Sequence, residues 1–116
     1  MGMQASHLHG HEFTPAYPKL ESTYIDGVLV AKMELFNYRK DVTFYELSVF
    51  DAQWNAIPFA TTSKIIEVQH LQRKYIEIFI RSKDKDKAVY ICSKSKLNPT
   101  GEQITMISSR ICSKIK

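Results

Sequence analysis

Short runs of alternating apolar and polar residues, separated by polar turns, fill the chain from residue 20 onward. In the run 28–36, every second residue is apolar: Leu29, Ala31, Met33 and Leu35. The side chains of a β-strand point alternately to its two faces, so a period of two over this length predicts a strand with one buried face. No segment shows a stronger 3.6-residue period, which would indicate an amphipathic helix.

The same alternation recurs in the runs 42–50, 64–69, 75–81, 88–95 and 104–115. The residues that share an apolar face in two of these runs are Tyr45, Leu47, Val49, Ile76, Ile78 and Ile80. The segment 56–60 contains Pro58, whose nitrogen has no hydrogen to donate, so it is expected as an edge strand or a strand that switches sheets. About seven short strands at this spacing predict an all-β fold, an immunoglobulin-like antiparallel β-sandwich.

The length of the chain fits one such sandwich. A chain of 116 residues is long enough for a single domain with a single core. Residues 1–18 are rich in His, Gly and Pro and show no periodic pattern, so we expect a flexible N-terminal tail. Residues 19–116 are expected to form the single immunoglobulin-like domain.

Cys92 and Cys112 are the only cysteines, and each lies in one of the last two strand-like runs. A hairpin centred near Glu102 sets them opposite each other, which predicts a cross-strand disulfide on the outer, less apolar face. Stable disulfides form in oxidising compartments, so we expect a periplasmic or secreted protein. Residues 1–11 lack the basic and apolar regions of a secretory signal, so export implies that a signal has been removed.

The charge of the chain is mildly positive and mixed in sign. Sixteen Lys and Arg residues stand against 12 Asp and Glu residues, and the run 81–87 alternates cations with acids. Nucleic-acid sites usually show a stripe of one sign with aromatic residues between the cations, so we expect no nucleic-acid partner. No apolar run approaches the roughly 20 residues of a membrane helix, so we expect no membrane insertion.

His7, His9 and His11 form the one cluster of candidate metal ligands. Alternating histidines present their imidazoles on one side of an extended chain, and imidazole binds Cu(II), Ni(II) or Zn(II) well. The competing interpretation is a histidine-rich leader or disordered tail that binds nothing. The sequence shows no nucleotide-binding glycine motif, no paired carboxylates and no nucleophile–base pair, so we expect neither enzymatic activity nor a cofactor.

Several of these elements occur in one order: a strand that ends in Leu35-Phe36-Asn37, the strand 42–51 leading to Ile57-Pro58-Phe59, the short strand 64–68 and the isoleucine-rich strand 75–81. In this order the stretch 33–115 resembles the N-terminal immunoglobulin-like domain of periplasmic pilus chaperones, the PapD-like fold. The last two strands are similar to the pair that some chaperones of this family join by a disulfide.

This resemblance implies binding by strand addition. In such chaperones the last strand of the domain lends alternating apolar side chains to an incomplete partner subunit. The matching positions are Ile104 and Met106 on one face, and Ile107 and Ile111 on the other. The family's paired basic anchor for a partner's C-terminal carboxylate is not carried over, because no arginine lies on the first strand.

Three functions fit these observations. The first is a non-catalytic periplasmic or extracellular protein-binding module, a chaperone-like accessory of pilus assembly whose partner is another protein or a second copy. The second is a periplasmic copper-binding protein that uses the N-terminal histidines, and the third is a structural subunit of a larger assembly. The aromatic residues Tyr38, Tyr45, Phe50, Trp54, Phe59 and Tyr90 are expected mainly in the core, and the alternative is a contact patch of Phe50, Trp54 and Phe59 at a sheet edge.

Overall fold

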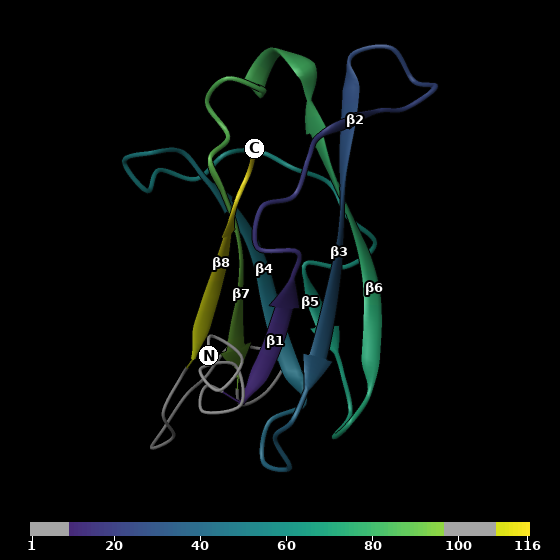
Figure 1. The fold of residues 1–116 in the computed structure, drawn as a ribbon, viewed down its shortest axis with the longest axis vertical. Helices are drawn as coiled ribbons and strands as arrows, with labels where there is room; N and C mark the ends of the chain where they lie inside the picture. The colour runs from purple at the N-terminus through teal and green to yellow at the C-terminus, as the bar shows by residue number, and fades with distance from the viewer. Residues whose placement is uncertain (1–9, 97–108) are drawn as a thin grey trace.

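A computed structural model describes residues 10–96 and 109–116 of the chain. These residues form two antiparallel sheets that pack face to face (Figure 1). The strands are β1 (His11–Thr14), β2 (Glu21–Ser22), β3 (Val28–Asn37), β4 (Phe44–Phe50), β5 (Ile65–Glu67), β6 (Arg73–Arg81), β7 (Tyr90–Lys96) and β8 (Arg110–Lys114). A short 3-10 helix, η1 (Ser82–Asp84), follows β6.

β3 is the centre of the first sheet. It pairs with β6 on one side and with β1 and then β2 on the other. The second sheet has the strand order β5-β4-β7-β8, and every pair in both sheets is antiparallel. The predicted all-β, immunoglobulin-like sandwich is confirmed, with eight strands in the described residues in place of about seven.

Side chains of the two sheets meet in one hydrophobic core. The predicted inward residues of the long strands are buried there: Ala31, Met33, Leu35, Tyr45, Leu47, Val49, Ile76, Ile78 and Ile80. Leu29, which shares their face on β3, is half-buried. A large apolar side chain stabilises the fold by about 1.5–3 kcal/mol when fully buried, so the alternation that predicts the strands also accounts for the main stabilising contacts.

Residues 10–18, the described part of the expected N-terminal tail, contain a strand; residues 1–9 lie outside the described residues. This strand, β1, pairs with β3, from His11 opposite Asn37 to Thr14 opposite Glu34. Its inward residues, His11 and Phe13, are buried. The pattern conceals this strand because one of its two inward side chains is a histidine, which is usually more exposed than an aliphatic residue.

The segment 56–60 connects the two sheets without forming a strand. Ala56 makes an isolated bridge to Phe50 of β4, and Ala60 makes one to Phe79 of β6. Pro58 lies between the two bridges. Because its nitrogen has no hydrogen to donate, Pro58 could not contribute a hydrogen bond to a longer ladder here. The segment therefore passes from one sheet to the other, as the proline suggests, but each sheet holds it at one position only.

Candidate functional site at the β7–β8 edge

β7 and β8 form one side of the second sheet, with β8 outermost (Figure 1). Cys92 and Cys112 are direct partners in the β7–β8 register, and their sulfur atoms are bonded at 2.01 Å. The predicted disulfide is thus confirmed. The Ser95 amide donates to the Ser109 carbonyl, so the cysteines occupy a non-hydrogen-bonded position, where Cα atoms approach most closely. Their Cα atoms are 4.0 Å apart.

The disulfide lies on the outer face of the sheet, as predicted. Ile91 and Ser93, the two neighbours of Cys92 in the chain, are fully buried on the inner face. Ile111, the partner of Ser93, also packs against the core. A slip of one residue would turn Ile111 to the outside, so the bond between the cysteines fixes the register that keeps β8 in place.

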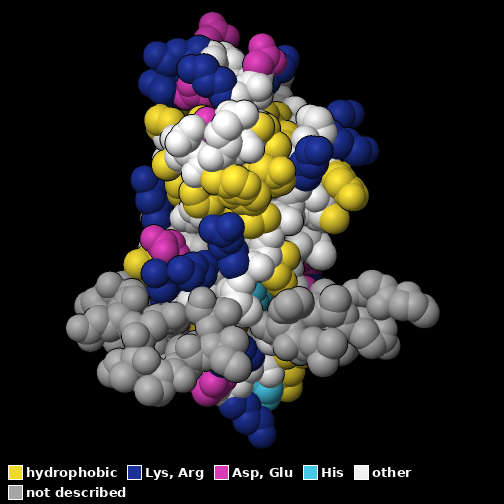
Figure 2. All heavy atoms as spheres, turned by 90° about the vertical axis from the view of Figure 1, so that its left-hand side faces the viewer, with side chains coloured by type: hydrophobic (Ala, Val, Ile, Leu, Met, Phe, Trp, Pro, Cys, Tyr) yellow, Lys and Arg dark blue, Asp and Glu magenta, His cyan; other side chains and the backbone are white. Residues whose placement is uncertain are grey.

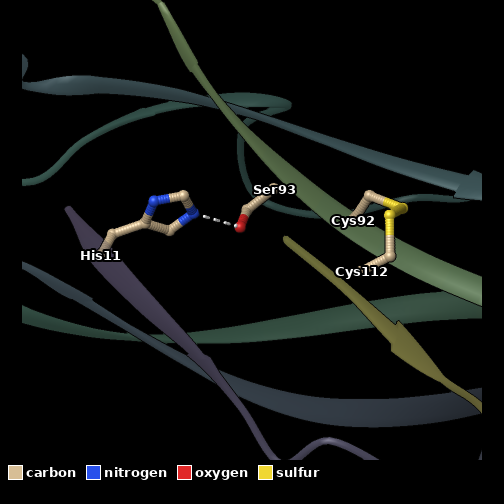
Figure 3. The surroundings of a disulfide bond; sticks show 4 residues. All are labelled: His11, Cys92, Ser93 and Cys112. Carbon is tan, nitrogen blue, oxygen red and sulfur yellow. Dashed lines mark hydrogen bonds between the residues drawn. A yellow bond between two sulfur atoms is a disulfide. The ribbon is translucent and has the colours of Figure 1, made fainter. Parts of the chain in front are cut away.

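A buried polar cluster lies beneath this pair of strands (Figure 3). The Nε2 atom of His11 lies 3.0 Å from the Ser93 hydroxyl, and its Nδ1 atom lies 3.5 Å from the Ser109 hydroxyl. The imidazole ring is also 4.7 Å from the ring of Tyr45, centre to centre. Figure 3 shows the imidazole pointing from β1 toward β7, with the disulfide on the other side of β7. The cluster therefore joins the first sheet to the residues that support β8.

Asn37 is the second polar residue of this interior. Its Oδ1 accepts a hydrogen bond from the Tyr45 hydroxyl at 2.5 Å, and its Nδ2 donates to the carbonyls of Val42 and Val68 at 2.8 and 2.9 Å. Burial raises the pKa of Tyr45 well above its ordinary value, so its hydroxyl stays a neutral donor at any physiological pH. These bonds satisfy polar groups that would otherwise be costly to bury.

The predicted metal ligands are only partly described. His7 and His9 lie outside the described residues, and His11 has no exposed surface. To bind a metal, the His11 imidazole would have to leave the two serine hydroxyls. Residues 10–96 and 109–116 contain no group of three His, Cys, Asp or Glu side chains placed to hold a metal ion. The three-histidine site stays a prediction.

Over its first half, the outer edge of β8 pairs with none of the residues 10–96 and 109–116. At its end, the amides of Lys114 and Lys116 donate to carbonyls of the segment 16–18, both at 2.9 Å. Alternate residues of β8 turn their backbone groups away from β7, so Arg110 and Cys112 direct theirs outward. Within the part of the chain that the structure describes, no strand pairs with these two positions. An unpaired edge of this kind is a template for another strand.

Ile111 is the one predicted partner-binding residue that the structure describes. It is half-buried and turned toward the core, so it holds β8 on the sandwich. Ile104, Met106 and Ile107 lie outside the described residues. The role of all four in binding a partner stays a prediction.

An aromatic cluster covers the outer face beside this edge. Trp54 stacks on Tyr90, with ring centres 4.2 Å apart and planes 3° apart, and the Phe50 ring centre is 5.6 Å from that of Trp54. The Arg110 guanidinium lies 5.1 Å from the Trp54 ring centre. Trp54 is still 46% exposed. On the side of the molecule where β8 lies, hydrophobic side chains gather with Lys and Arg side chains around them (Figure 2).

This cluster differs in membership from the aromatic patch considered from the sequence. It contains Phe50 and Trp54, whereas Phe59 packs against the hydrophobic core. Tyr90 stands where Phe59 was considered, although the sequence placed Tyr90 among the aromatic residues expected in the core. The available signal was its spacing: Tyr90 stands two residues before Cys92 and therefore leaves the strand on the same outer face.

No protein-family model matches the chain, and no curated protein does. Solved structures of two chaperones match it over 90% of its length. The SafB chaperone of Salmonella enterica, solved in complex with the SafA pilin, matches with a TM-score of 0.65 at 13% identity. The E. coli chaperone DraB matches with a TM-score of 0.65 at 14% identity. The chain has the PapD-like fold of pilus chaperones.

This likeness confirms the resemblance seen in the sequence, at the level of the fold. The chain spans about half the length of these two chaperones, 52% of each. None of the helical residues in the described ranges forms a stretch long and apolar enough to cross a membrane.

Proposed function

We propose that this chain is a non-catalytic, chaperone-like protein-binding module that takes up an extended partner segment along β8, as an accessory of pilus assembly. The observation that carries the proposal is the outward edge at Arg110 and Cys112, which no described strand covers. The PapD-like fold supports it, since this edge belongs to a sandwich of the kind that SafB and DraB contain.

The geometry of β8 suits strand addition. An added strand gains affinity from backbone hydrogen bonds and specificity from alternate side chains. The disulfide and the inward Ile111 fix the strand before a partner arrives, which reduces the entropy lost on binding. Trp54 and Tyr90 lie on the face beside the edge, and these are residue types that dominate binding energy at protein interfaces. Ile104, Met106 and Ile107, which precede β8 in the sequence, are the proposed apolar donors.

The proposed location is the periplasm or the exterior of the cell. The disulfide supports this location, because reducing cytosolic conditions would disfavour it. A pilin-type subunit that lacks one strand of its own sandwich is the proposed partner.

The experiment is co-purification of such a subunit with the chain from the periplasm, compared between two variants of one residue. Arg110→Pro removes the outward N–H while leaving intact the bonds of neighbouring residues to β7. Arg110→Ala removes the same side chain but keeps the N–H. We expect Arg110→Ala to retain the subunit and Arg110→Pro to lose it, with far-UV circular dichroism confirming that both are folded. Equal retention by a folded Arg110→Pro variant would refute the proposed edge.

A further inference from the structure

On the side away from β8, a second edge strand has a stretch that is unpaired among the described residues. β6 is the outermost strand of the first sheet (Figure 1). Its odd-numbered residues turn their backbone groups away from β3, as the two bonds between Phe79 and Ala60 show. The outward groups of Arg73 and Tyr75 and the amide of Glu77 have no hydrogen-bond partner among the described residues.

A groove of about 670 Å³ runs beside this edge, between β6 and β5. Its aliphatic lining residues are Met33, Ile65, Ile66 and Ile76. Tyr75, at the middle of the open stretch, is 77% exposed. An added strand would therefore find both unpaired backbone groups and space for its inward side chains.

The charges along the edge are self-complementary. Arg73 and Glu77 lie two residues before and two residues after Tyr75, and all three side chains are exposed on the outer face of the sheet. If two copies pair antiparallel about a two-fold axis at Tyr75, Arg73 of each copy lies opposite Glu77 of the other. Within each copy, Arg73 on β6 forms an ion pair with Glu34 on the neighbouring strand β3, and this ion pair holds the Arg73 side chain on the outer face. Opposite charges directly across an antiparallel pair are stabilising.

We propose that two copies of this chain associate edge to edge through β6, so that the first sheets of the two copies become one continuous sheet. Residues that turn outward form the hydrogen-bonded pairs of an antiparallel ladder. The amide and carbonyl of Tyr75 therefore exchange hydrogen bonds with those of the second copy, and the Glu77 amide donates to the carbonyl of Arg73 across the interface. On the inner face, Lys74 of one copy lies opposite Ile76 of the other, where its aliphatic stem covers apolar surface.

The two-fold axis makes the interface isologous and closed, so association stops at the dimer. A single strand pair buries little surface, so we expect a weak dimer whose population rises with protein concentration. β6 and β8 lie on opposite sides of the molecule, and the inference is therefore independent of the proposed function (Figure 1).

The test is sedimentation equilibrium of the full chain and of two charge variants. Arg73→Glu makes positions 73 and 77 both acidic, and Glu77→Arg makes them both basic. In a homodimer of either variant, like charges therefore lie opposite each other at both 73–77 pairs. We expect the dimer of each to be weaker than the wild-type dimer by roughly tenfold or more. An equimolar mixture restores opposite charges at both positions, and we expect it to form a heterodimer of near wild-type affinity.

Two further variants keep the test independent of any loss of folding. Tyr75→Pro removes the central outward N–H without touching a bond to β3, and we expect it to be monomeric. Lys85→Glu makes the same kind of charge change in the loop after η1, and we expect it to dimerise like the wild type. A wild-type chain that stays monomeric at the highest attainable concentration, or a mixture that associates no better than its components, would overturn the proposal.

Discussion

At the scale of single residues, Asp51 organises the turn that presents Trp54. Its Oδ1 accepts the amides of Asn55 and Gln53 at 2.8 and 2.9 Å. Trp54 has a φ of 67°, a conformation that non-glycine residues adopt rarely. The bonds to Asp51, that from the Asn55 backbone above all, hold the pKa of its carboxyl below its usual range. The carboxylate thus supports the backbone geometry that sets Trp54 on Tyr90.

The lowered pKa of Asp51 determines the sign of its effect on stability. The group is more acidic in the folded than in the unfolded chain, so its stabilising contribution is present above about pH 4 and is lost as the pH falls through the folded value. We expect the near-UV circular dichroism of Trp54, the only tryptophan, to change below that pH in the wild type. Asp51→Asn should show the altered signal already at neutral pH and no such acid transition.

The matched control for this titration is Asp86→Asn, an exposed carboxyl in the loop after η1. It should keep the wild-type transition. An identical acid transition in Asp51→Asn and the wild type would show that another group controls Trp54.

His11 is the residue whose structural role differs most from its expected one. We expect His11→Ala to lower the free energy of unfolding by about 2–4 kcal/mol, because it deletes a buried ring and leaves the Ser93 hydroxyl without this partner. Urea denaturation measures the change. His70→Ala replaces an exposed histidine and should change stability by no more than about 0.5 kcal/mol. Equal small effects of the two substitutions would contradict the buried role of His11.

The sequence could not reveal this role. Its periodicity predicts which face a side chain takes on a strand, and those assignments are confirmed for β3, β4 and β6. The partners of His11 are Ser93 and Ser109, which lie 82 and 98 residues further along the chain. No local pattern connects positions that far apart, so a buried histidine and a ligand histidine look alike until the sheets are assembled.

At the scale of elements, the Cys92–Cys112 disulfide fixes β8 to β7. We expect the double variant Cys92→Ser and Cys112→Ser to lose about 3 kcal/mol of unfolding free energy, because the bond closes a loop between residues 20 positions apart. Urea denaturation measures this loss. The intact protein, isolated from an oxidising compartment, should show no free thiol when it is denatured without reductant. Two free thiols would contradict both the clamp and the compartment that it supports.

The long strands could be predicted from the sequence because each has a clear buried face. β2 could not, since its two residues, Glu21 and Ser22, are both exposed and are held only by pairing with β3. The open edge of β6 could not be predicted either. It depends on the path of the segment 60–63, which pairs with β6 at Phe79, donates from the Thr61 hydroxyl to the Glu77 carbonyl and leaves the Glu77 amide open before it departs toward β5.

At the scale of the whole molecule, β8 and β6 are edge strands on opposite sides of the sandwich, and each has a stretch that no described residue pairs with (Figure 1). One copy can therefore pair through β6 while its β8 remains available to a different partner. The fold itself was accessible from alternation and turn spacing. Which edges could bind a partner was not accessible from the sequence, because this depends on which backbone groups the assembled sheets leave without hydrogen-bond partners.

Amide hydrogen exchange of β8, with and without a bound pilin-type subunit, tests the central claim most directly. In the free protein the outward amides of Arg110 and Cys112 should exchange rapidly, while the Ile111 amide, directed to β7, is protected. Strand addition predicts that the subunit slows the exchange of Arg110 and Cys112 by about tenfold or more, with a smaller change at Ile111. A stable complex in which Arg110 and Cys112 exchange as fast as in the free protein would contradict capture along β8.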